Sequence, residues 1–147
     1  MKESSMGNVQ WSDNLSIGVD VIDEQHKALI QRLNDLHAAI TSHQGQSAIA
    51  GTLNFLIEYS RFHFDAEEKY MAASNYPGLN QQVAEHNEFR ESLNTIERDF
   101  EEDGATHELA AAIDTLLINW LIEHIQNVDL KLGEYLRDNN ITLPDEG

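Results

Sequence analysis

Apolar residues recur at intervals of three and four along most of the chain, the pattern of an amphipathic α-helix that faces a core. Four long segments show this pattern, at roughly residues 20–42, 47–72, 80–102 and 107–138. No segment shows the strict apolar–polar alternation that predicts a strand. In the fourth segment the predicted inward stripe consists of Leu109, Ile113, Leu116, Trp120, His124, Val128 and Leu132.

Short breaks separate these segments. The sequences NYPG at 75–78 and EDGAT at 102–106 contain the residues that end helices. Four helices with short connections predict an all-α fold, an antiparallel up-down-up-down four-helix bundle. We expect a single domain over residues 1–147: the bundle at about 19–138, an irregular N-terminal arm at 1–18, and a tail or linker start at 139–147. Trp11 and Ile17 are expected to attach the arm to the bundle.

Composition narrows the range of functions. The 147 residues include 26 acidic and nine basic side chains, for a formal net charge of −17. Such a charge repels nucleic acid and anionic membrane surfaces. No apolar run reaches the roughly 18 residues of a membrane span, and the N-terminus lacks the apolar core of a signal peptide. Cysteine is absent, which excludes disulfides and thiolate metal sites. We therefore expect a cytoplasmic protein with neither nucleic acid nor a membrane as a partner.

Histidines on the inward faces carry the strongest chemical signal. A single inward histidine is ordinarily a core residue satisfied by one hydrogen bond, but four are costly to bury unless their nitrogens find partners. Glu67 follows one of them, His63, by four residues, which places both side chains on one side of the helix as a sensible pair of metal ligands. A metal site in the core would satisfy the four inward histidines, one per helix: His26, His63, His86 and His124. The other three are expected to be structural or exposed: His37, His43 and His107.

The choice of metal stays open at this level. Imidazole suits iron, zinc, copper or nickel, and carboxylates suit harder ions. A ferritin-like di-iron site would place a glutamate three residues before a histidine on two helices. That pattern fails here, because the residues three before the inward histidines are Asp23, Ser60, Val83 and Leu121. Histidine and carboxylate ligands from four helices represent a different design.

Four motifs occur in order: WSDNLSIGVDVIDEQHKALI (11–30), HFDAEEKYM (63–71), AEHNEF (84–89) and WLIEHIQNVD (120–129). They resemble bacterial hemerythrins, oxygen-binding four-helix proteins with two non-haem irons, and the resemblance covers roughly residues 10–137. It implies that one iron takes His26 and His63 and that the other takes His86 and His124. It further implies that Glu67 and Asp129 bridge the irons alongside an oxo or hydroxo group. The oxygen pocket would be lined by Leu29, Phe64, Trp120, Leu121 and Ile125.

The role of Asp129 comes from this resemblance and not from helical geometry. Asp129 follows His124 by five residues, which in an α-helix turns the two side chains about 140° apart. The two side chains would have to straddle the inward face. The alternative is that Asp129 only pairs with Lys131 or Arg137.

Gln82 is a departure from the family pattern, which has a further histidine four residues before the position of His86. Six of the seven usual protein ligands therefore remain. We expect Gln82 either to be a weak ligand or to mark an open position that water or an external ligand fills.

The resemblance implies a protein that binds molecular oxygen or other small ligands and is not an enzyme. Two alternatives stay open: a di-iron oxidase or peroxidase, and a structural or storage metal bundle. In this family the domain occurs alone or joined to a signalling output module. The sequence therefore does not distinguish an oxygen carrier from an oxygen sensor or an enzyme.

Overall fold

The computed structural model describes residues 10–142; the start of the expected arm (1–9) and the end of the expected tail (143–147) lie outside the described residues. Three helices are uninterrupted: α1 (Asp20–Thr41), α2 (Gln46–Ala73) and α3 (Leu79–Asp103). The fourth consists of consecutive segments: α4 (His107–Ala112), η2 (Ile113–Ile118), α5 (Asn119–His124), η3 (Ile125–Asp129) and α6 (Leu130–Asp138). Both η2 and η3 are π-helical.

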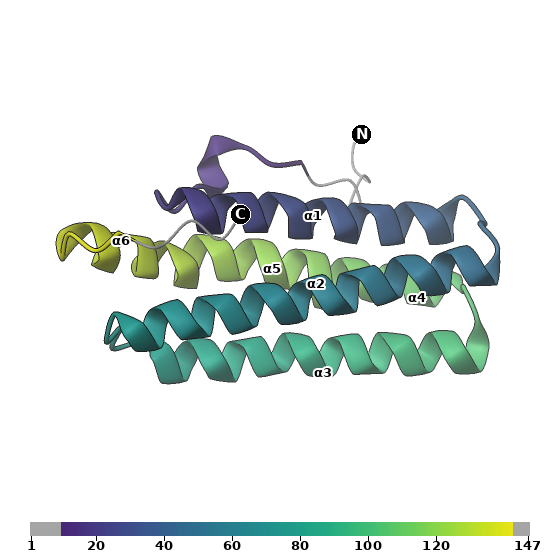
Figure 1. Cartoon of the computed structure of the whole chain (residues 1–147). Helices are drawn as coiled ribbons and strands as arrows, with labels where there is room; N and C mark the ends of the chain where they lie inside the picture. The colour runs from purple at the N-terminus through teal and green to yellow at the C-terminus, as the bar shows by residue number, and fades with distance from the viewer. Residues whose placement is uncertain (1–9, 143–147) are drawn as a thin grey trace.

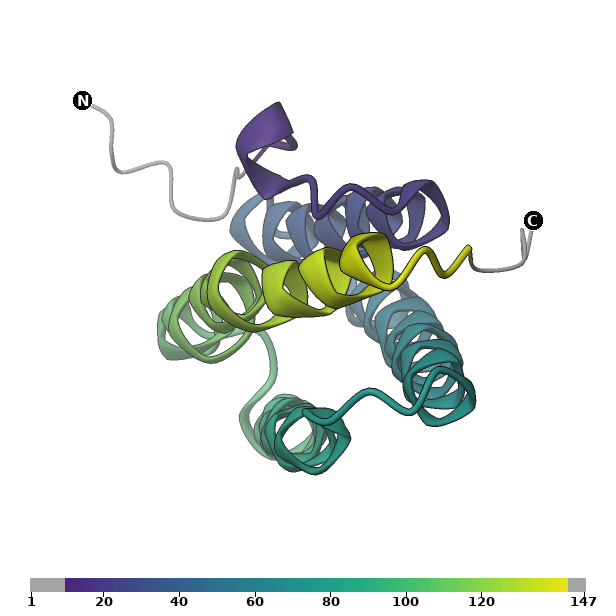
Figure 2. The ribbon, with the colours of Figure 1, turned by 90° about the vertical axis from the view of Figure 1, so that its left-hand side faces the viewer.

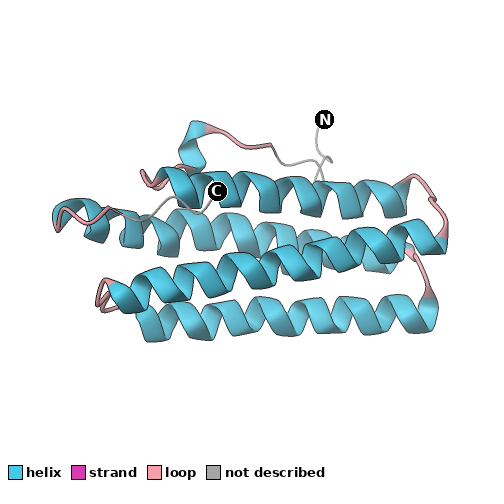
Figure 3. Cartoon of the chain, viewed as in Figure 1, coloured by secondary structure: helices cyan, strands magenta, loops and turns pink. Residues whose placement is uncertain are grey.

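The four helical rods lie side by side, and each runs antiparallel to the one before it (Figure 1). Seen from one end, they surround a common interior (Figure 2). No strand occurs between residues 10 and 142 (Figure 3). The predicted all-α, up-down-up-down bundle is therefore confirmed. Within the same residues, no helix is long and apolar enough to cross a membrane.

The connections end each helix by local backbone chemistry. His43, Asn75 and Gly104 have φ angles of 58°, 57° and 77°, in the left-handed region that stops α-helical hydrogen bonding. Thr106 then caps α4, since its hydroxyl accepts a hydrogen bond of 3.0 Å from the N–H of Leu109. These short turns make consecutive helices antiparallel neighbours.

The π-helical segments change which residues of the fourth helix face the core. A π turn closes its backbone hydrogen bond over five residues instead of four, as between the N–H of Asn119 and the oxygen of Asp114. The extra residue rotates the side chains around it. Leu117 is therefore fully buried, while Leu116 is 38% exposed. The inward prediction for Leu116 is wrong because apolar periodicity assumes an uninterrupted α-helix.

The N-terminal arm is fixed at the start of α1 and on α6. It contains a short 3₁₀ turn, η1 (Asp13–Leu15), and Ile17 is buried while Trp11 packs half-buried against the core. The carboxylate of Asp23 accepts hydrogen bonds from the Ser16 hydroxyl at 2.6 Å and the Ile17 N–H at 3.0 Å. Trp11 and Ile17 thus attach the arm as expected.

Gly133 allows the arm to approach α6 closely. A Cβ atom at this position would overlap the backbone oxygen of Ile17. Gly133→Ala is expected to lower the free energy of unfolding by about 1–3 kcal/mol, the usual cost of overpacking, in urea denaturation. Gly51→Ala in α2 is the matched control, because a Cβ there meets nothing within 4 Å. It should stabilise by about 0.5–1 kcal/mol. Equal effects of the two changes would contradict the close approach.

Candidate metal centre

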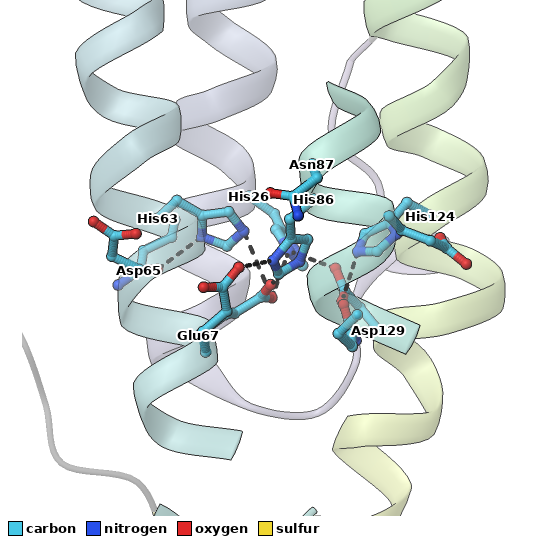
Figure 4. A network of polar contacts seen from close by, with 12 residues as sticks. His26, His63, Asp65, Glu67, His86, Asn87, His124 and Asp129 are labelled. Carbon is cyan, nitrogen blue, oxygen red and sulfur yellow. Dashed lines mark hydrogen bonds and ion pairs between the residues drawn. The ribbon is translucent and has the colours of Figure 1, made fainter. Parts of the chain in front are cut away.

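Polar side chains from all four helical rods converge inside the bundle (Figure 4). By their positions in α2 and α3, they lie nearer the end that carries the α2–α3 connection. Their imidazoles and carboxylates turn toward one another. Each is at most 3% exposed: His26, His63, Glu67, Gln82, His86, His124 and Asp129. Burying so many polar groups opposes folding unless partners satisfy them.

The candidate ligand atoms form two groups, in each of which the atoms lie within 4.8 Å of one another. The first group contains His26, His63 and Glu67; the second contains Glu67, His86, His124 and Asp129. Glu67 belongs to both groups, so the geometry describes two adjacent positions.

Glu67 faces the two positions with different oxygens. Its Oε2 lies 3.4 Å from Nε2 of His26 and 3.5 Å from Nε2 of His63. Its Oε1 lies 3.2 Å from Nε2 of His86. A carboxylate in this orientation offers one oxygen to each of two metal ions.

The two oxygens of Asp129 also face different histidine groups. Its Oδ2 lies 3.1 Å from Nε2 of His26, and its Oδ1 lies 3.2 Å from Nε2 of His124. Ligand atoms at right angles around an ion, with bonds of about 2.1 Å, are about 3 Å apart. The observed separations are close to this size, so the two histidine groups and the two carboxylates could hold two adjacent metal ions.

A π turn brings Asp129 to this position. In η3 the N–H of Leu130 bonds to the oxygen of Ile125, five residues back. Residues five apart then lie one turn above each other, so His124 and Asp129 point to one place. The mismatch expected for a regular α-helix is removed by this local change of helix type.

Unsatisfied atoms support the same interpretation. Buried polar atoms in proteins nearly always have a hydrogen-bond partner, and exceptions need an explanation. One cation pair would explain a whole set of buried atoms that lack a hydrogen bond among the described residues: Nε2 of His26, His63, His86 and His124, both oxygens of Glu67, Oδ2 of Asp129 and Oε1 of Gln82.

Three of the histidines are oriented through their other nitrogen. Each Nδ1 lies 2.8 Å from an oxygen of the preceding helix along the chain: His63 with Gln25, His86 with Glu68, and His124 with Glu85. An Nδ1–H donated to such an oxygen leaves the Nε2 lone pair directed at the centre.

These three partners were missed by sequence reasoning, although their positions carry a signal. Gln25 precedes His26, Glu85 precedes His86, and Glu68 follows Glu67. An adjacent residue is turned about 100° around a helix, so it leaves the centre and meets the ligand of the neighbouring helix.

The charges in the cluster shift its proton affinities. Burial lowers the pKa of His26, but the close, negatively charged carboxylates of Asp129 and Glu67 outweigh burial and raise the pKa to about 9. Burial likewise lowers the pKa of His124, and Asp129 again raises it, to about 9. For His63 burial dominates and lowers the pKa to about 4. Burial raises the pKa of both carboxyls, but the histidines outweigh it, holding Glu67 at about 2 and Asp129 well below its usual value.

The residues expected around an oxygen pocket lie in or beside the apolar core. Leu29, Phe64, Leu121 and Ile125 are buried, and Trp120 is half-buried. Phe64 stacks on the ring of His86 with centroids 4.2 Å apart. Trp120 stacks on the ring of His124 at 4.6 Å. Two of the four imidazoles are thus covered by aromatic rings.

The remaining histidines lie outside both groups. His37 pairs with Asp114 at 3.3 Å. His43 is exposed in the α1–α2 connection, and His107 is exposed at the start of α4.

Residues 17–136 match the Hemerythrin HHE cation binding domain, so the chain belongs to the hemerythrin family. It is 33% identical over 132 residues to a bacteriohemerythrin of Stenotrophomonas maltophilia, covering 90% of this chain and 84% of that protein. It is 30% identical over 125 residues to a bacteriohemerythrin of Clostridium acetobutylicum, covering 81% and 94%. A myohemerythrin of Theromyzon tessulatum is 25% identical over 122 residues, covering 83% and 88%. The resemblance inferred from the four motifs is confirmed.

The buried carboxylates of Glu67 and Asp129 should matter more for metal binding than carboxylates on the surface. Glu67→Ala and Asp129→Ala are each expected to weaken iron binding by at least about tenfold, because two adjacent cations lose a shared counter-charge. Iron per chain after anaerobic loading and desalting is the measurement. Glu101→Ala and Glu102→Ala, both exposed at the end of α3, are the controls and should change nothing. A full iron complement in both bridge variants would contradict the assignment.

Metal binding should also release protons. At pH 7.5 the metal-free protein holds protons on His26 and His124, whose pKa values are raised from 6.5 to about 9, so ferrous loading should release about two more protons at pH 7.5 than at pH 10.5. His63 contributes none, because its pKa is lowered to about 4. Anaerobic titration with an indicator dye in weak buffer measures the release. Equal release at both pH values would be inconsistent with these two protonated ligands.

The same two protons affect the stability of the metal-free fold. Their contribution is fully present below the ordinary pKa of 6.5 and is lost as the pH rises through about 9.

Proposed function

We propose that this protein binds molecular oxygen reversibly at a centre of two non-haem iron ions. The proposal rests mainly on the orientation of Glu67 and Asp129. Each carboxylate turns one oxygen toward each histidine group. His26 and His63 would hold one ion, and His86 and His124 the other. Two ferrous ions side by side supply the two electrons needed to hold oxygen.

The chain itself supplies a preorganised set of donors. His63, His86 and His124 are each fixed at Nδ1 by a hydrogen bond of 2.8 Å, so each presents Nε2 to the interior. Glu67 and Asp129 carry two negative charges that partly neutralise the cations. Because the donors come from four packed rods, the centre does not need to be assembled when metal arrives.

Apolar side chains around the centre favour reversible binding over net oxidation. Phe64 and Trp120 cover His86 and His124, and Leu29, Leu121 and Ile125 would extend the wall. Such a wall limits water and disfavours the departure of charged products. Oxygen leaves as a neutral molecule, which the wall does not oppose.

The relatives support this proposal through what they are named. They are bacteriohemerythrins and a myohemerythrin, and the matching domain is described as cation binding. We propose that the domain binds oxygen as a carrier or sensor, with binding and release in place of substrate turnover.

The test is an optical titration of iron-loaded protein with oxygen. Reduced protein with about two irons per chain should gain a visible absorption band in air and lose it when oxygen is removed by argon. The iron-poor Glu67→Ala variant is the control and should gain little. A single iron per chain, or a band that argon cannot reverse, would contradict reversible binding. Steady consumption of hydrogen peroxide would instead support a peroxidase.

A further inference from the structure

Gln82 is a further buried polar residue of the centre, beside the six candidate ligands. It lies on α3 one turn before His86 and is fully buried. Its Nε2 donates a hydrogen bond of 2.9 Å to Oδ1 of Asp129, the oxygen that faces His124. Its Oε1 is buried without a hydrogen-bond partner among the described residues.

A purely orienting role for Gln82 accounts for only half of its amide. Orienting Asp129 requires the N–H₂ group and leaves a buried carbonyl oxygen unpaired, which destabilises the fold. An apolar side chain of similar shape would avoid that cost. Most of the other buried atoms without a partner belong to the six candidate ligands. An amide oxygen is a hard ligand atom, of the kind that binds hard metal cations.

We propose that Gln82 is a fifth protein ligand of the metal ion held by His86 and His124. It would bind through Oε1 while Nε2 keeps its hydrogen bond to Asp129. This inference rests on the two-metal part of the proposed function. It requires neither that the metal be iron nor that oxygen bind.

The two metal positions are then unequal. The position of His26 and His63 has four protein donors, two imidazoles and one oxygen from each carboxylate. The position of His86 and His124 also has two imidazoles and one oxygen from each carboxylate, and Gln82 adds a fifth donor. The metal ion beside Gln82 is therefore bound first and more tightly.

The partners of the imidazoles act in the same direction. His86 and His124 donate to the carboxylates of Glu68 and Glu85, whereas His63 donates to a neutral amide. Carboxylate partners make an imidazole a stronger donor to a metal. Nδ1 of His26 has no hydrogen-bond partner in the described part of the chain.

Stepwise cobalt(II) binding tests the role of Gln82. Cobalt(II) binds similar ligands, and its visible absorption strengthens when its coordination number falls. Wild-type protein should bind two ions in two distinguishable steps by calorimetry. In Gln82→Leu the tighter step should weaken at least about tenfold, the weaker step should stay within about twofold, and absorption per bound ion should rise. Gln31→Leu on the exposed face of α1 is the matched control and should match wild type.

Two further variants keep the test decisive if leucine disturbs folding, which the melting temperature of each metal-free variant monitors. Gln82→Met retains an unbranched chain without an oxygen and should behave as Gln82→Leu does. Gln82→His supplies a stronger donor and should tighten the first step. Carbon-13 spectra of the zinc-loaded protein give a direct measurement, because the carboxamide carbon of Gln82 should shift on loading while that of Gln31 stays.

The outcomes separate this inference from the proposed function. If wild type binds fewer than two ions, the two-metal centre fails. If wild type binds two ions and the leucine and methionine variants bind them with unchanged affinity and absorption, Gln82 is not a ligand and only the present inference fails.

Discussion

The burial of two carboxylates among four imidazoles is the constraint on which the rest of this structure depends. The carboxylates carry two negative charges in a place that water does not reach, and such charges are tolerated only when paired. In the metal-free protein, protons on His26 and His124 supply the compensation, which is why their pKa values are raised to about 9. In the metal-loaded protein, two cations would replace those protons. The same groups are therefore compensated by protons in the metal-free protein and could be compensated by cations in a metal-loaded one.

The remaining polar contacts follow from the need to hold these six groups in one orientation. Each helix contributes an imidazole to the centre. On three helices, a residue adjacent to a candidate ligand contacts the imidazole of the following helix. Gln25, Glu68 and Glu85 therefore connect α1 to α2, α2 to α3 and α3 to α5 by contacts of the same length, 2.8 Å. Because these contacts cross helix boundaries, the geometry of the centre and the packing of the bundle depend on one another.

These partners would make the two candidate metal positions different. Anionic oxygens face the histidines of the second position, and a neutral amide faces His63 of the first. A protein that binds a small ligand at one ion of a pair benefits from such a difference, since one ion can stay fixed while the other exchanges ligands. The aromatic contacts also differ: Phe64 and Trp120 stack on His86 and His124, whereas Phe64 meets His63 only at a tilt, with centroids 5.4 Å apart.

Apolar periodicity alone determined the four helices, and the turns followed from residues such as Gly104 and Asn75, because helix formation and termination are governed by local chemistry. The inward positions of His26, His63, Glu67, His86 and His124 were predictable for the same reason. Their convergence on one metal site was also predicted, from the shared inward faces and from the resemblance to hemerythrins. The atoms that face one another were not predictable, since they depend on how four helices pack. Asp129 and Leu116 show most clearly what apolar periodicity could not predict. Two π turns shift the register of the fourth helix, and a π turn is stabilised by tertiary contacts that no periodic pattern encodes. The sequence therefore determined which chemistry was present, and the tertiary structure decided which atoms of Asp129, Gln82 and the three orienting partners take part in it.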